Sequence, residues 1–80
     1  MKVTVHIERR PVIADPEGAT IGRSLSDLGY QEVTAVRTGR TLHMDIDGDD
    51  AEKVRARVSE MCERLLANPV IEDYRVEVGE

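Results

Sequence analysis

The fold is decided by the stretch Met61-Cys62-Glu63-Arg64-Leu65-Leu66-Ala67-Asn68-Pro69-Val70-Ile71-Glu72-Asp73-Tyr74. Its first part places apolar residues at the spacing of one helix face. Asn68-Pro69 then ends the helix, because proline disfavours the α region for the residue before it and has no backbone N–H to donate. The apolar alternation that begins at Tyr74 predicts a strand to the end of the chain. The stretch therefore predicts a helix followed directly by a half-buried strand.

The helix that leads into this stretch is predicted to begin at Asp49. The Asp49 side chain can cap the first turn, and Glu52 stands three residues on, as in a capping box. The predicted buried stripe recurs at intervals of three and four residues and consists of Ala51, Val54, Val58, Met61, Leu65 and Leu66.

The first half of the chain predicts a strand and a helix. Residues 2–9 alternate between apolar and polar side chains, which is typical of a strand buried on one face. Asp15-Pro16-Glu17 predicts a helix start, with Asp15 as the cap. Gly29 suits the left-handed residue after a helix. The predicted buried face of this helix is Ile21, Leu25 and Leu28.

The middle of the chain predicts two further strands. The segment 33–38 is the first, Gly39-Arg40 is expected to form a turn, and Leu42, Met44 and Ile46 belong to the returning strand. The element order is then β-α-β-β-α-β. This order predicts one α+β domain over residues 1–80, a ferredoxin-like sandwich with both helices on one face of a four-stranded antiparallel sheet.

Composition excludes several functions. A net charge of −5, with Lys and Arg interleaved among acids, does not favour a nucleic-acid surface. The two tyrosines, Tyr30 and Tyr74, are not placed to stack bases on central strands. A single cysteine suits a reducing compartment, and the chain shows no export or membrane-spanning segment. We therefore expect a cytoplasmic protein that binds neither nucleic acid nor a membrane.

No residue of the chain has a pattern typical of catalysis. Cys62 stands alone beside an apolar stripe, and the acids from Asp45 to Asp50 lack the glycine and the final glutamate of a calcium loop. His6 and His43 are expected on the outer sheet face, where exposed polarity explains them better than a metal does. The sequence predicts no catalytic, cofactor-binding or metal-binding residue. A stand-alone enzyme is therefore not expected, and any catalytic activity would belong to partner subunits.

The residues resemble one known family. In addition to the opening stretch, the matching pieces are Asp15-Pro16-Glu17-Gly18, Leu25, Leu28-Gly29-Tyr30, Val33 and Val36-Arg37-Thr38-Gly39-Arg40. In this order and spacing they resemble the PurS family, the small subunit of phosphoribosylformylglycinamidine synthase in purine biosynthesis. The resemblance implies a non-catalytic subunit of an amidotransferase complex, which bridges the glutaminase and the ATP-dependent synthetase and assists ammonia transfer between them.

The resemblance also implies a homodimer, and the sequence leaves open a dimer of dimers. ATP, Mg and glutamine are then used by the partner subunits, and this chain binds no cofactor. We expect dimer and partner contacts on the outer sheet face and the 37–40 turn, at His6, Arg37, Gly39, Arg40, His43, Asp45 and Arg75. Two alternatives remain open from the residues: a stand-alone ferredoxin-like regulatory domain that binds a small molecule, and a purely structural oligomer.

Overall fold

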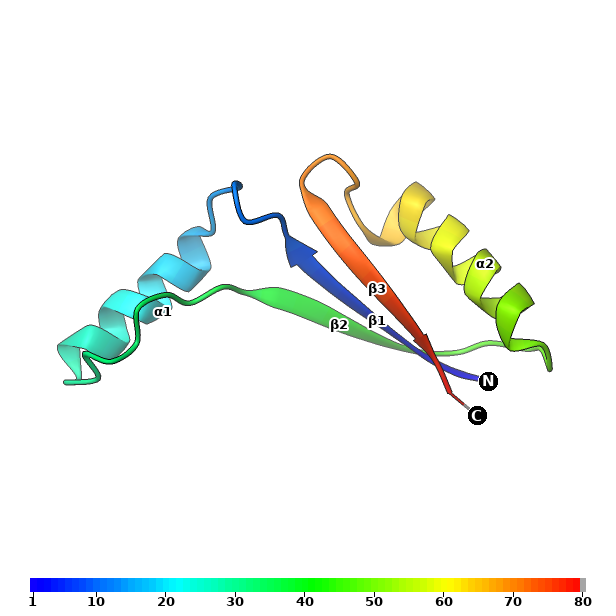
Figure 1. The fold of residues 1–80 in the computed structure, drawn as a ribbon, viewed down its shortest axis with the longest axis horizontal. Coiled ribbons are helices and arrows are strands. Elements are labelled where there is room, and N and C mark those ends of the chain that lie inside the picture. The colour runs from blue at the N-terminus through cyan, green and yellow to red at the C-terminus, as the bar shows by residue number, and fades with distance from the viewer. Residues whose placement is uncertain (80) are drawn as a thin grey trace.

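The computed structural model of the chain describes residues 1–79 and has an α+β fold (Figure 1). The elements, in chain order, are β1 (Lys2–Arg9), α1 (Pro16–Asp27), β2 (Gly39–Asp45), α2 (Ala51–Met61), the single π-helical turn η1 (Cys62–Leu66) and β3 (Glu72–Val78). The predicted first and last strands and both predicted helices are therefore present.

The sheet of the described residues has three antiparallel strands in the order β2-β1-β3. β1 is central, and the predicted alternation along it is confirmed: Val3, Val5 and Ile7 are buried. They form the core with Val54, Val58 and Cys62 from the helical segment that covers this face. The core therefore lies between the sheet and the segment formed by α2, η1 and Ala67, and α1 contributes none of its buried residues.

The predicted fourth strand and its turn are wrong for the single chain. Residues 33–38 are extended but join no sheet, and they run directly into β2 without a hairpin (Figure 1). Gly39 is the first residue of β2 and has no positive φ, so it forms no turn. It serves instead for close approach: a Cβ there would lie 2.6 Å from the Ile7 carbonyl oxygen on β1. A glycine can mark a contact as well as a turn.

The first helix begins and ends as predicted. Asp15 is its N-cap and accepts a hydrogen bond from the Gly18 amide, and Gly29 has a φ of +100° just beyond the C-terminus. Its predicted burial is wrong, however: α1 lies away from the sheet, Ile21 is 39% exposed, and Leu28 is 74% exposed. The expectation that both helices cover one face of the sheet therefore fails within one chain (Figure 1).

The second helix begins one residue later than predicted. The side chain of Asp50, not that of Asp49, accepts from the amides of Glu52 and Lys53. Val54 and Val58 are buried as expected, but Leu65 is 83% exposed. The cause is η1, because a π-helical turn adds residues to the turn and rotates the stripe. Cys62 is the residue of this turn that becomes fully buried.

The chain is elongated, with principal extents of 49 × 26 × 14 Å. One end holds the sheet with α2, and the other is formed by α1 and the extended residues after it (Figure 1). We call residues 16–38 the arm. Because the arm adds little to the core, its position has to be explained by other contacts.

Candidate assembly interface

The arm is held together by small residues and one buried carboxylate. Gly18 lies so close to the Val36 carbonyl that a Cβ at Gly18 would overlap it, and Gly22 faces the Val36 side chain. Asp15 is only 8% exposed and accepts from the Thr38 amide at 2.6 Å and from the Thr38 hydroxyl at 2.8 Å. These contacts fix α1 against residues 33–38 as one rigid unit.

Asp15 is held in its charged form. The hydrogen bond from the Thr38 amide, followed by that from Gly18, lowers the pKa of Asp15 from 3.8 to about 2. Hydrogen bonds to a carboxylate favour the ionised group. The ionised Asp15 therefore links the arm to the sheet, because it caps α1 and also binds Thr38, the residue before β2.

The arm exposes the apolar face that was predicted to be buried. Ile21, Leu28, Tyr30 and Val33 are all more than a third exposed. In addition, none of the turn and loop backbone hydrogen bonds within residues 1–79 involves residues 34–37. An apolar helix face and an unpaired extended segment are both features that a partner satisfies.

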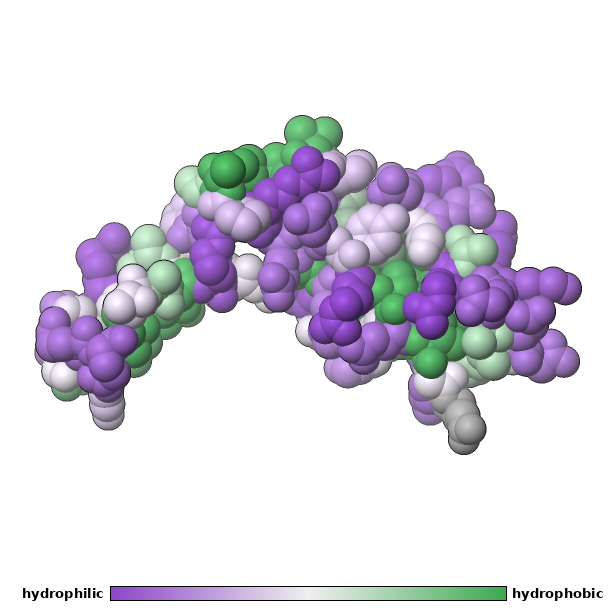
Figure 2. Space-filling view, viewed as in Figure 1, coloured by the Kyte–Doolittle hydropathy of each residue, from purple (hydrophilic) through white to green (hydrophobic). Residues whose placement is uncertain are grey.

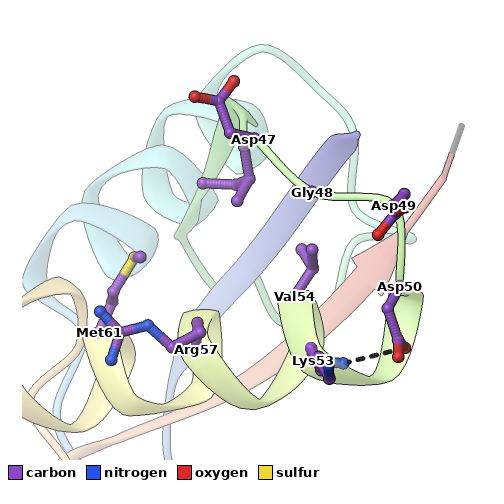
Figure 3. Close-up of a pocket in the computed structure, with 9 residues that line it drawn as sticks. Asp47, Gly48, Asp49, Asp50, Lys53, Val54, Arg57 and Met61 are labelled. Carbon is purple, nitrogen blue, oxygen red and sulfur yellow. Dashed lines mark hydrogen bonds between the residues drawn. The ribbon is translucent and has the colours of Figure 1, made fainter.

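A groove runs along α2 on the same molecule. One hollow of about 270 Å³ has Ile46, Val54 and Met61 in its lining, with Asp49, Asp50, Lys53 and Arg57 also around it. In Figure 3, Val54 and Met61 rise from α2 on the side of the loop that carries Asp47 and Gly48. A second hollow of about 230 Å³ shares Arg57 and Met61 and continues toward Leu65.

The groove lies where a ferredoxin-like sandwich would place its other helix. Leu42 and Met44 of β2 are only half-buried although they pack against the core. The inner face of the sheet is therefore incompletely covered beside α2, while an apolar helix of the same chain is uncovered.

The outer sheet face brings four of the predicted interface residues together. His6 on β1 lies opposite Arg75 on β3, and His43 on β2 lies opposite Thr4 on β1. Asp45 lies at the end of the same face, where its carboxylate is 2.7 Å from the Lys2 ammonium. Within residues 1–79, no three His, Cys, Asp or Glu side chains converge to hold a metal ion.

Charges on this face are paired within the chain. The Lys2 hydrogen bond lowers the pKa of Asp45. The hydrogen bond from Arg75, followed by the proximity of His6, lowers the pKa of Glu77; the His6 Nε2 atom lies 3.3 Å from a Glu77 carboxylate oxygen but makes no well-aligned hydrogen bond within residues 1–79. The outer face is therefore polar, and the groove along α2 lies on the opposite side of the sheet.

Of the other three predicted residues, Gly39 also lies along the outer face but has no side chain, and Arg37 and Arg40 lie elsewhere. Arg37 donates to the carbonyls of Arg9, Arg10 and Ile13 and so fixes the loop after β1. Gly39 lies opposite Glu8. Arg40 faces the helix side and binds Glu72. The structure therefore gives Arg37 and Arg40 contacts within the chain.

Sequence reasoning missed the double role of Asp15 and the arm itself. The cap was visible from Asp15-Pro16, but its second bond to Thr38 joins residues far apart in sequence. The glycines at 18 and 22, four residues apart on one helix face, were the available signal for close helix contact.

Among the described residues, no helix is both long and apolar enough to cross a membrane.

These features describe a class: a small α+β protein that exposes an apolar helix face and has a groove, in part apolar, along its other helix. A family model described as PurS, phosphoribosylformylglycinamidine (FGAM) synthase, matches residues 2–80. The chain belongs to the PurS family.

Curated relatives agree. The PurS subunit of phosphoribosylformylglycinamidine synthase from Methanocaldococcus jannaschii is 44% identical over 96% of this chain and 93% of its own length. The corresponding Bacillus subtilis subunit is 42% identical over 99% of this chain and 93% of its own length. PurS proteins are subunits of FGAM synthase, an enzyme of purine biosynthesis.

Solved structures show the same fold. The crystal structure of M. jannaschii PurS has a TM-score of 0.88 at 43% identity and covers 99% of this chain and 95% of that one. A structure of PurLQS from Thermotoga maritima contains a chain with a TM-score of 0.86 at 34% identity, covering 95% of this chain and 93% of that one.

Proposed function

We propose that this chain is the non-catalytic small subunit of a phosphoribosylformylglycinamidine synthase complex. In this role it bridges the glutaminase and the ATP-dependent synthetase and assists ammonia transfer between them. Family membership supports the complex, as does the similarity to a chain of the Thermotoga maritima PurLQS structure. The observation that carries an assembly role is that one chain has both an arm with an exposed apolar face and a groove with apolar side chains in its lining.

The homodimer belongs to the same proposal. β2 is an edge strand, and residues 33–38 continue its direction. If two copies lie antiparallel about Gly39, residues 33–38 of each copy become the fourth strand beside β2 of the other. Each α1 is then carried over the groove along α2 of the partner. This arrangement completes the predicted four-stranded sandwich from two chains and pairs the exposed edges.

The exchange also explains the exposed side chains. Ile21, Leu25 and Leu28 supply an apolar helix face, and the groove offers Ile46, Val54 and Met61. Burying an aliphatic side chain of this size stabilises a structure by about 1.5–3 kcal/mol. An 80-residue chain buries only a small core of its own, so apolar burial between two copies would add a large share of its total stability.

The outer sheet face is proposed as a surface for the larger subunits, through His6, His43, Asp45 and Arg75. The exchange leaves this face free, because it uses the opposite face and the edge of β2. His43→Glu is the cleaner probe of the face, since Arg40→Glu would also break the intrachain pair with Glu72. The expected result is weaker complex assembly and slower glutamine-dependent turnover.

A joining subunit has a physical purpose. Ammonia released into water is protonated and diluted, and it loses its nucleophilic lone pair. A docked path that excludes water keeps it neutral and near its target. In this proposal the complex is cytoplasmic, ATP, Mg and glutamine are used by the partner subunits, and this chain supplies shape rather than reacting groups. The regulatory-domain alternative is not favoured, because the relatives above are all named PurS.

The test compares two nitrogen sources. Product formation by the purified large subunits is measured with and without this chain, driven either by glutamine or by added ammonium. The proposal expects omission of the chain to remove the glutamine-driven rate and leave the ammonium-driven rate. Equal glutamine-driven rates with and without the chain would exclude a coupling role.

A further inference from the structure

Two segments of chain connect the arm to the sheet, and side chains tie them together. Residues 9–15 lead from the end of β1 into α1, and residues 37–38 lead from the arm into β2. We call these two segments the joint. The Arg37 guanidinium donates to three carbonyls of the first segment, those of Arg9, Arg10 and Ile13, at 3.3, 2.9 and 3.1 Å. One side chain therefore spans the end of β1 and the loop that follows it.

The second segment of the joint is fixed along its whole length. Gly39 pairs with Glu8 of β1, and Thr38, one residue earlier, donates its amide to the Asp15 carboxylate at 2.6 Å and its hydroxyl at 2.8 Å. Arg37 adds a positive charge close to the same carboxylate. The chain therefore cannot form a hairpin at this place without breaking these contacts.

The joint holds the arm away from the rest of its own chain. The Cα radius of gyration is 16.1 Å. A compact domain of the same length has a radius of gyration of about 12 Å. Figure 2 shows hydrophobic surface on the arm, at the left of the view, away from the sheet and α2. The extended shape thus leaves exposed an apolar helix face that closure of the arm onto the groove would bury.

The same apolar face can be covered in two ways. Either α1 lies over the groove of its own α2, with residues 33–38 folded back along the free edge of β2, or α1 and these residues make the same contacts with a second copy. Contacts within one chain have an effective concentration of roughly millimolar order when the linker can span the sites. A second copy at lower concentration is then outcompeted. An exchanged dimer therefore requires that closure be disfavoured at the hinge.

We propose that Arg37 is a positioning residue whose guanidinium holds the arm extended, so that the arm packs on a second copy of this chain rather than on its own sheet. The inference rests on the homodimer of the proposed function and adds what selects exchange over closure. The planar fork of an arginine donates to several carbonyls at once, whereas a lysine presents one compact ammonium. The residue type at position 37 therefore matters beyond its charge.

The experiment measures the dimer and the shape of the monomer in the full chain. Sedimentation equilibrium at several concentrations gives the dissociation constant, and small-angle X-ray scattering of the diluted protein gives the radius of gyration of the monomer. Arg37→Gln should weaken the dimer at least about tenfold. It should also lower the monomer radius from 16.1 Å toward about 12 Å. Arg37→Lys keeps the charge and should change both quantities in the same direction by less.

The matched control is Arg23→Gln. Arg23 is exposed on α1, and its guanidinium donates to Thr20 of the same helix, so its loss should leave the dimer and the monomer radius unchanged. Circular dichroism checks that each variant is folded. If Arg37→Gln does not fold, Arg37→Lys is judged by the same two measurements.

The two measurements separate positioning from a merely structural role, which would lower stability without making the monomer more compact. If the Arg37 variants dimerise as tightly as the unchanged chain, or dimerise less tightly while their monomers stay extended, Arg37 does not hold the arm and the homodimer of the proposed function stands. If the unchanged chain is monomeric at every concentration, the homodimer is overturned and this inference with it.

Discussion

The guanidinium of Arg40 holds the buried carboxylate of Glu72 with two hydrogen bonds, of 2.7 Å from Nη1 to Oε2 and 3.2 Å from Nη2 to Oε1. The pair joins the start of β2 to the start of β3 across the central strand. Arg40 also donates to the Leu66 carbonyl, and Glu72 accepts from the Asn68 amide. One ion pair thus fixes the end of η1 and the loop that follows it.

Replacement of Arg40 should therefore destabilise the chain. Arg40→Ala leaves Glu72, which is 9% exposed, without its main donor, and we expect a loss of about 1–3 kcal/mol in the free energy of unfolding at pH 7. Urea unfolding measures it. The control is Arg75→Ala, whose pair with Glu77 is exposed and worth about 0–1 kcal/mol. Equal losses from the two substitutions would contradict the structural role of the Arg40–Glu72 pair.

The same pair has a pH dependence. The Arg40 hydrogen bond, followed by that from Asn68, lowers the pKa of Glu72 below 4.5. A lowered pKa stabilises the fold above the unfolded-state value and ceases to do so as pH falls through the folded value. The destabilisation caused by Arg40→Ala should therefore be largest near neutral pH and shrink on acidification below pH 4.5. Urea midpoints of both proteins across this range check it.

Gly18 tests the packing of the arm. A Cβ at residue 18 would overlap the Val36 carbonyl, so Gly18→Ala should separate α1 from residues 33–38 and destabilise the chain by about 1–3 kcal/mol. Gly22→Ala is the matched control on the same helix, because a Cβ there lies 3.8 Å from the nearest Val36 atom. Since alanine favours helix more than glycine does, it should be neutral or stabilising by up to about 1 kcal/mol. Thermal denaturation of both variants would show whether they differ in sign.

Asp15 should govern acid stability at the joint of the arm. Its pKa falls from 3.8 to about 2, so its carboxylate stabilises the fold above pH 3.8 and loses that effect as pH falls toward 2. Asp15→Asn should remove this part of the acid dependence, measured by urea midpoints across the same range. Asp49→Asn is the comparison, because Asp49 is exposed and Asp50, not Asp49, caps α2. An unchanged acid profile in Asp15→Asn would exclude the role assigned to Asp15.

The exposed face of α1 predicts the oligomeric state. Under the proposed exchange, Leu28→Asp puts a charge into the groove of the partner chain and should weaken the dimer about tenfold or more. Thr20→Asp adds the same charge to an exposed residue outside the apolar face of α1 and should leave the dimer intact. Sedimentation equilibrium at several concentrations gives both constants. A dimer unaffected by Leu28→Asp would show that α1 is not exchanged.

Local signals in the sequence predicted the elements well. The alternation over residues 2–9, the Asp15 cap and the glycine at 29 depend on neighbours within a few residues, and each is confirmed. The error at Leu65 arose at the π-helical turn, where the assumed period of 3.6 fails for a few residues. The error at residue 39 arose because its glycine meets a distant carbonyl rather than forming a turn.

The candidate interface was only partly predictable. His6, His43, Asp45 and Arg75 do share one face, because strand alternation fixes which side chains point outward. Arg37 and Arg40 stay predicted partner contacts, and what the sequence did not indicate is that both also bind groups within the chain. A sequence does not show which acceptor a long, flexible arginine reaches.

By itself, the sequence determined where helices and strands begin, which residues alternate toward a core, and which family the chain resembles, since these follow from short-range backbone preference and residue order. Only the tertiary structure decided where α1 lies. The apolar face of Ile21, Leu25 and Leu28 needs to be buried, but its periodicity is the same whether the covering surface belongs to this chain or to another. The straight path from residue 33 into β2 places that face beyond the reach of its own sheet.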